Sequence, residues 1–234
     1  MPLRTGVVAA LVALVAGMGI TIFLGVLAML GFTLANGHPP TIEAGQPFNT
    51  LLLLLFYGVS GWVARGRLRA TGLHVFRRLG RRDALAIVVG FIALIVAHVL
   101  TGLQLVLTHQ TQHVQVGFEH FSVAGRTPLL TDLSIATTAA TLVLIAPVVE
   151  ETIFRGLLFG ALMRPLGVFF GALVSAVLFG LVHGDAVLFP TLAALGFINA
   201  LAYAATENLT VPVILHALNN AFATAFLVAH AYKM

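Results

Sequence analysis

Three ionisable residues lie close together within a strongly apolar stretch of the sequence, residues 146–160, which reads APVVEETIFRGLLFG. A charged side chain inside a bilayer costs at least about 2.5–3.5 kcal/mol, so such residues face the protein interior or water and take partners. Glu151 and Arg155 are four residues apart with the acid first, a spacing that favours an ion pair on one helical face. Glu150 has no cation at that spacing, and a carboxylate held in a low dielectric can act as a general base.

Two further apolar segments carry imidazole and amide groups. His183 ends the sequence FGLVH, and the later sequence HALNN holds His216 and Asn220 four residues apart, on one helical face. Asn220 and its neighbour Asn219 are amides that need hydrogen-bond partners inside a membrane. We expect the three segments to converge on one buried polar cluster with Glu150, Glu151, Arg155, His183, His216 and Asn220 as candidate site residues. The alternative is that these groups only join transmembrane helices by hydrogen bonds.

The composition indicates a membrane protein. The chain has 234 residues, of which 59% are hydrophobic and only 9% are charged, whereas soluble domains carry about a quarter charged residues. Runs of about 20 apolar residues recur, and each is long enough to cross a hydrocarbon core of about 30 Å as a helix. We predict an all-α, polytopic transmembrane helical bundle with a buried polar cavity. About seven spans are expected, at residues 7–34, 48–64, 84–107, 131–163, 167–184, 188–206 and 209–231.

A basic segment, residues 65–82, holds seven arginines in the sequence RGRLRATGLHVFRRLGRR. Positive residues in short loops stay cytoplasmic, which predicts that the N-terminus and the turn at 163–166 lie inside and the loop at 108–130 outside. The arginines are expected to anchor this topology and to contact anionic membrane lipid, with a role in substrate docking as the alternative. Because they cluster at one membrane edge, they do not indicate nucleic-acid binding.

We interpret the chain as one integrated domain with two parts. Residues 1–128 form N-terminal transmembrane helices with a basic cytoplasmic loop at 65–82, and residues 129–234 form a transmembrane core that holds the candidate site. The first span is expected to be retained, because its apolar run is longer than that of a signal peptide. The absence of cysteine excludes disulfides and thiolate metal sites. We expect an integral, multi-pass membrane protein, with its site open to the cytoplasmic side or to the membrane interior.

The three motifs, taken in order on successive spans, resemble those of the CPBP family. This family contains the CAAX prenyl endopeptidases and their bacterial bacteriocin-processing relatives, and is also called the Abi family. The resemblance covers about residues 130–231, and it implies a protein of a bacterial inner or plasma membrane. The residues that carry it are Glu150-Glu151-x-x-x-Arg155, then Phe179-x-x-x-His183, then His216-x-x-x-Asn220.

The resemblance implies an intramembrane endopeptidase that hydrolyses a peptide bond of a membrane-associated or lipidated protein or peptide. By that likeness Glu150 would activate water with the help of His183, and His216 and Asn220 would steady the oxyanion of the intermediate. Glu151 and Arg155 would orient the site. The residue types agree, because the cluster contains no serine, threonine or cysteine nucleophile. A carboxylate base with donors for developing negative charge is sufficient for amide hydrolysis.

The cofactor is left open. His183 and His216 with Glu150 could bind Zn²⁺, as two imidazoles and a carboxylate do in hydrolytic zinc sites. The sequence lacks the His-Glu-x-x-His spacing of most zinc proteases. We prefer a metal-free mechanism and keep a divalent metal such as zinc as the alternative.

Some of these residues would also suit other functions. Ser60, in the sequence GVSG, resembles the rhomboid serine, but rhomboids place a His-x-x-x-Asn motif before the serine and this chain has it long after. Helix packing is the simpler role for Ser60. The same polar cluster could serve a non-catalytic peptide-binding or immunity protein, or an ion- or proton-coupled transporter. No internal repeat supports the transporter.

Several other polar residues have simpler interpretations. We expect His98 to be a packing residue, Asp185 to cap a helix and Pro147 to kink the span before the paired acids. Asn199 is a weaker candidate for lining the cavity. The loop at 108–130 contains two histidines four residues apart, and we interpret it as a solvated outer loop rather than a metal site; its ionisable residues are His109, His113, Glu119 and His120.

Overall fold

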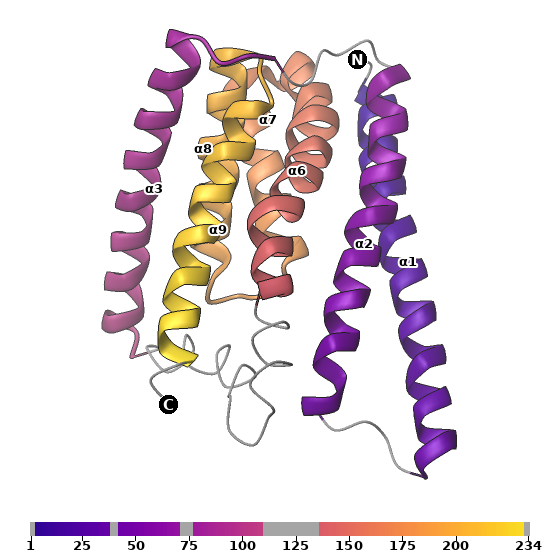
Figure 1. The fold of residues 1–234 in the computed structure, drawn as a ribbon. Coiled ribbons are helices and arrows are strands. Elements are labelled where there is room, and N and C mark those ends of the chain that lie inside the picture. Colours follow the sequence, from indigo (N-terminus) through magenta and orange to yellow (C-terminus); the bar gives the residue numbers. More distant parts are fainter. Residues whose placement is uncertain (1–2, 38–41, 71–76, 110–135, 232–234) are drawn as a thin grey trace.

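The computed structural model describes residues 3–37, 42–70, 77–109 and 136–231, and the elements within these ranges are all helical (Figure 1). They are α1 (Leu3–Asn36), α2 (Ile42–Ala70), α3 (Arg81–Leu107), η1 (Thr141–Ile145), α6 (Ala146–Glu151), η2 (Thr152–Phe159), α7 (Gly160–Val182), α8 (Phe189–Thr206) and α9 (Thr210–Ala231). The segments η1 and η2 are π-helical. The predicted all-α class is confirmed.

Four helical stretches in the described residues are long and apolar enough to cross a membrane: Arg4–Asn36, Arg81–Leu107, Ala136–Val182 and Phe189–Thr206. The predicted number of about seven spans is therefore not confirmed. One reason lies in α2, whose apolar part is the shorter helix Leu51–Gly66. A second reason is that Ala136–Val182, which is 47 residues long, counts as one helical stretch although the chain reverses its direction within it.

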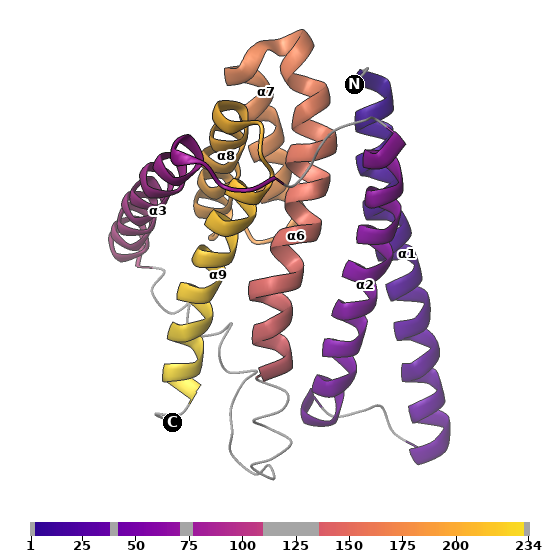
Figure 2. The same cartoon turned by 45° about the horizontal axis from the view of Figure 1, so that its top comes forward.

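The reversal occurs at Gly167, whose φ of 75° and ψ of 170° are not helical. Glycine adopts positive φ without a steric penalty, which makes it suited to this turn. The two arms lie close together beside the turn: a Cβ added to Gly171, after the turn, would lie 3.0 Å from the backbone of Met163, before it. Farther along the two arms, the Ser175 hydroxyl donates to the Phe154 carbonyl at 3.3 Å. In a straight helix these two residues would be about 31 Å apart, so the two arms pack against each other (Figure 2).

The helices form two groups around this helical hairpin. α1 and α2 pack against each other on one side of α6 and η2, and α3, α8 and α9 lie on the other side (Figures 1 and 2). The N-terminus, the start of α3 and the Gly167 turn lie at the same end of the bundle, while the C-terminus lies at the opposite end. This arrangement is the one that the predicted topology requires, and the membrane side of each end stays a prediction.

The core of the bundle is built around η2. Ile153, Phe154 and Leu157 are buried there, and they belong to one apolar cluster with Phe179 of α7 and Leu215 of α9. The outer faces of α1 and α3 instead expose large apolar side chains along their length. Such surfaces suit a hydrocarbon solvent, as expected for an integral membrane protein.

One arginine of the basic segment has a structural role. The guanidinium of Arg77 donates to the Thr206 carbonyl and lies 3.7 Å from the carboxylate of Asp83. The side-chain amide of Asn208 donates to the Arg77 carbonyl at 3.4 Å. These contacts attach the chain before α3 to the turn between α8 and α9. Residues 71–76 lie outside the described part of the chain.

We predict that Gly171→Val destabilises the helical hairpin. The added side chain would press on the backbone of Met163, and overpacking of this kind costs about 1–3 kcal/mol. Thermal unfolding in detergent should show a lower midpoint than for Gly102→Val in α3, where a Cβ meets nothing within 4 Å. Equal midpoints for the two variants would contradict the close contact of the two arms.

Candidate active site

The paired acids stand at the end of α6, between the π-helical segments η1 and η2. Such segments are rare and are frequent at functional sites. In η1 the amide of Ala146 bonds to the carbonyl of Thr141, five residues earlier. By the same five-residue spacing, the carbonyl of Leu142 would accept from the backbone N–H of residue 147, but Pro147 has no N–H. The side-chain amide of Asn220 donates to this carbonyl at 2.8 Å, so α9 satisfies a backbone group that the proline leaves without a donor.

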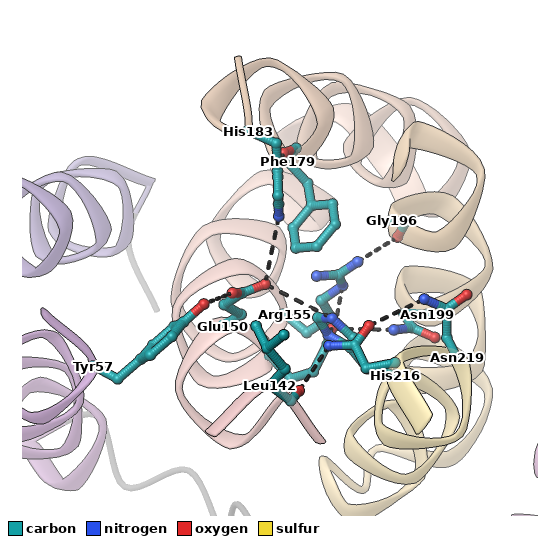
Figure 3. A network of polar contacts seen from close by, with 12 residues as sticks. Tyr57, Leu142, Glu150, Arg155, Phe179, His183, Gly196, Asn199, His216 and Asn219 are labelled. Atoms are coloured by element: carbon teal, nitrogen blue, oxygen red, sulfur yellow. Dashed lines mark hydrogen bonds and ion pairs between the residues drawn. The ribbon is translucent and has the colours of Figure 1, made fainter. Parts of the chain in front are cut away.

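Glu150 is contacted by groups from three other parts of the chain (Figure 3). Its Oε1 accepts a hydrogen bond from the Tyr57 hydroxyl of α2 at 2.5 Å. Its Oε2 lies 3.9 Å from Nε2 of His183 and 3.8 Å from Nε2 of His216. These two distances are too long for direct hydrogen bonds. Among the described residues, the buried Oε2 atom has no hydrogen-bond partner.

Both imidazoles are held through their Nδ1 atoms. Nδ1 of His183 is 2.7 Å from the carbonyl oxygen of Phe179, and Nδ1 of His216 is 2.8 Å from Oε1 of Glu151. A carbonyl and a carboxylate accept hydrogen bonds, so each Nδ1 donates, and each Nε2 is left to face Glu150. The His183 side chain is 31% exposed and that of His216 only 4%. The cluster is therefore accessible beside His183.

Glu151 and Arg155 form the ion pair that their spacing predicts. Nε of Arg155 lies 3.0 Å from Oε2 of Glu151, and both side chains are fully buried. Oε1 of Glu151 also accepts from the amide of Asn199 at 3.1 Å. Nη2 of Arg155 donates to the Gly196 carbonyl at 2.9 Å, and the guanidinium lies 4.7 Å from the centre of the Phe179 ring, a cation–π contact. This pair connects the hairpin to α8.

Five of the six predicted site residues meet through these contacts: Glu150, Glu151, Arg155, His183 and His216. The sixth, Asn220, donates to Leu142 and accepts from Asn219 at 3.1 Å.

A hollow of about 470 Å³ on the surface of α2 is apolar and separate from this polar cluster. That hollow is lined by Leu51, Leu54, Leu55, Gly58, Val59 and Trp62.

Two members of the cluster were not among the predicted site residues. Tyr57 comes from the half of the chain without a motif, and Asn199 was only a weak candidate for lining the cavity. The signal for Tyr57 was a hydroxyl within an apolar span, because such a group needs a hydrogen-bond partner there. Asn199 carried the same kind of signal, since a buried amide also needs partners.

The remaining polar residues have structural roles. Ser60 is fully buried and faces Gly17 of α1, where a Cβ would lie 2.0 Å from its hydroxyl oxygen, in agreement with a packing role. Asp185 accepts the backbone N–H groups of Val187 and Leu188 at 2.9 Å each, in the turn before α8. The N-cap of α8 is Leu188 and has no side-chain hydrogen bond, so the predicted helix cap is not confirmed. His98 bonds through Nδ1 to the Leu94 carbonyl at 2.8 Å. The predicted outer-loop residues His113, Glu119 and His120 lie outside the described residues.

The described residues do not fit a metal site. They contain no group of three or more His, Cys, Asp or Glu side chains that is arranged to hold a metal ion. The nearest set is Glu150 with His183 and His216, whose nitrogens both lie nearly 4 Å from one oxygen. We therefore derive no chemical step through a metal, and the preference for a metal-free reaction stays a prediction.

We predict that Arg155→Met strongly destabilises the protein, because it leaves the carboxylate of Glu151 buried without its cation. Breaking a buried pair in this way costs about 3–5 kcal/mol. Thermal unfolding should show a much smaller effect for Arg164→Met, which changes an exposed arginine in the same helical stretch. The double variant Glu151→Gln/Arg155→Met should regain part of the loss. A single variant as stable as the control would contradict the role of the pair.

Comparison with known proteins finds a family and two curated relatives that are similar to part of this chain. Residues 132–222 match the family model described as type II CAAX prenyl endopeptidase Rce1-like, a range that includes all three motifs. The chain is 40% identical over 79 residues to "Putative membrane peptidase YdiL" of Bacillus subtilis (strain 168), covering 34% of this chain and 32% of the relative. It is 36% identical over 89 residues to "Membrane-embedded CAAX protease MroQ" of Staphylococcus aureus (strain USA300), covering 36% of each.

The matches have a defined extent. The chain matches about a third of the length of these curated relatives. No solved structure matches the chain significantly. The resemblance predicted from the three motifs is nevertheless confirmed, because the matched range holds every residue that carries it. Residues 132–222 thus resemble the Rce1-like CAAX prenyl endopeptidase family.

Proposed function

We propose that this protein is an intramembrane endopeptidase that cleaves a membrane-associated or lipidated protein or peptide by means of a water molecule activated by Glu150. The observation that carries the proposal is the placement of Oε2 of Glu150 at 3.9 and 3.8 Å from Nε2 of His183 and His216. Polar atoms at this separation are suited to sharing a bridging water. The family match of residues 132–222 supports a membrane peptidase independently.

The hydrogen bonds of Glu150 and His183 suit the activation of water. With Nδ1–H donated to Phe179, the neutral ring of His183 offers its Nε2 as an acceptor. A water that donates one hydrogen to this nitrogen and the other to Oε2 directs its lone pairs away from both. As the oxygen attacks the scissile carbonyl, Glu150 takes the proton and later gives it to the leaving amine.

Two side chains are proposed to stabilise the oxyanion. His216 can donate from Nε2 only as the imidazolium, and the hydrogen bond from its Nδ1 to Glu151 would hold that cation. The amide nitrogen of Asn220 carries two hydrogens, of which one is donated to Leu142, so the second is available for the substrate. Donors placed before the reaction need no reorganisation when negative charge develops.

The substrate class is proposed from the family and the surroundings of the site. The Staphylococcus relative is named a CAAX protease, whereas the Bacillus relative is named only a membrane peptidase. We propose a peptide or lipidated protein that reaches the site within the membrane, with no prenyl group assigned.

We predict that Glu150→Gln abolishes cleavage but leaves peptide binding within about twofold of the unchanged protein. Loss of a general base lowers the rate by about 10²–10⁴-fold, and the amide keeps the shape of the side chain. Purified protein in detergent would be tested on a panel of lipidated and unlipidated fluorogenic peptides, with Glu207→Gln at the exposed α8–α9 turn as the control. Cleavage by Glu150→Gln at the normal rate would overturn the mechanism. If cells that carry Glu150→Gln keep the phenotype of the unchanged protein without cleavage, a peptide-binding protein would be favoured.

We predict that Asn220→Ala lowers turnover by about 10²–10³-fold, the usual effect of removing one oxyanion donor. Turnover would be expressed per folded protein, because the same amide also satisfies the Leu142 carbonyl. Asn36→Ala is the control, since that side chain donates to the Phe32 carbonyl at the exposed end of α1. Turnover of Asn220→Ala close to that of the control would remove Asn220 from the oxyanion site.

A further inference from the structure

Tyr57 links the N-terminal helices to the candidate active site. It lies in α2, outside the segment 132–222 that matches the family, and its hydroxyl donates to Oε1 of Glu150 at 2.5 Å. The residue is only 6% exposed. Figure 3 shows its ring approaching Glu150 from the side opposite His216. A hydroxyl from a different part of the chain thus reaches the carboxylate that is proposed to activate water.

The position of this hydroxyl is fixed by close packing of α2 against α6. Gly61 lies four residues after Tyr57, on the same face of α2. A Cβ at Gly61 would lie 3.0 Å from the side chain of Val149, the neighbour of Glu150 in the sequence. The ring of Tyr57 also packs edge-on against Phe56, with the ring centres 5.1 Å apart. The helix contact and the ring contact together hold the phenol in reach of Glu150.

The hydrogen bond distinguishes the two oxygens of the carboxylate. The last torsion of a glutamate side chain has a broad, roughly twofold preference, so packing alone does not fix the plane of the carboxylate. Donation to Oε1 holds that plane and leaves Oε2 facing the two imidazoles. The bond can persist during the reaction, because Oε1 still accepts a hydrogen bond after Oε2 has taken a proton from water.

We propose that Tyr57 is a positioning residue for Glu150, and that the first two helices therefore supply part of the active site. This inference rests on the proposed function. It assigns α2 a task in the reaction that no motif in the C-terminal half of the chain contains. It also explains why a tyrosine hydroxyl stands in an apolar span.

The test is Tyr57→Phe, which removes one oxygen atom and keeps the ring. We expect kcat to fall by about 10–100-fold, because a hydrogen bond to a charged group is lost and the base is misplaced. KM should stay within about twofold, because Tyr57 is not proposed to touch the substrate. The assay uses the fluorogenic peptide that the unchanged protein cleaves fastest. Tyr203→Phe in α8 is the matched control, because its ring packs against Phe159 away from the cluster.

A double-mutant cycle separates positioning from general stabilisation. Glu150→Asp shortens the side chain by one methylene and withdraws the carboxylate from the phenol, so Tyr57→Phe should cause little further loss in that background. Thermal unfolding of each variant gives the folded fraction to which kcat is normalised. Losses that multiply in the double variant would show that the hydroxyl does not act through Glu150, and would overturn the proposal.

Other outcomes of these assays separate a failure of the positioning role from a failure of the proposed function. If the unchanged protein cleaves the peptide, Glu150→Gln does not, and Tyr57→Phe keeps the normal kcat, the positioning role is wrong and the proposed function stands. Equal losses in Tyr57→Phe and Tyr203→Phe would likewise overturn the positioning role. If the unchanged protein cleaves no peptide in the panel, the proposed function fails and the role of Tyr57 fails with it.

Discussion

The buried ion pair between Glu151 and Arg155 is the constraint on which the rest of the site depends. Both side chains are fully buried, and charges in a low-dielectric environment must be neutralised and hydrogen-bonded. The pair alone does not satisfy them. Asn199 and His216 donate to Glu151, and Arg155 donates to the Gly196 carbonyl. The need to complete these contacts fixes α8 and α9 against the hairpin, and it also fixes the imidazole that faces Glu150.

Close approach of the helices makes these polar contacts possible. Lipid gives no hydrophobic driving force for association between apolar helices, so small residues that let backbones approach are favoured. Gly196 lies so close to Ala176 of α7 that a Cβ would come within 3.0 Å of its backbone, and the same glycine accepts from Arg155. Gly61 plays the corresponding part between α2 and α6, beside Tyr57 and Glu150. Small residues and the polar cluster therefore form one system, in which the close packing sets the hydrogen-bond distances.

Much of the candidate site could be predicted from the sequence because charge in a membrane leaves few choices. The spacing of Glu151 and Arg155 predicted their ion pair, and the need for partners predicted that His183 and His216 converge on the acids. The bond of Asn220 to Leu142 could not be predicted, because it depends on the π-helical turn of η1 before Pro147. The predicted count of spans was not confirmed, since α2 has a shorter apolar helix and the structure runs residues on both sides of Gly167 into one helical stretch.

The sequence by itself determined the membrane class, the helical spacing within each motif and the identity of the groups that had to be paired. These properties depend on the apolar content of each segment and on helix geometry, which are local. Only the tertiary structure decided that Tyr57 holds one oxygen of Glu150 while two imidazoles face the other. It also decided that Asn199 completes the shell of Glu151. The physical reason is that a distance between helices depends on how their surfaces pack, and no spacing along one chain segment encodes that distance.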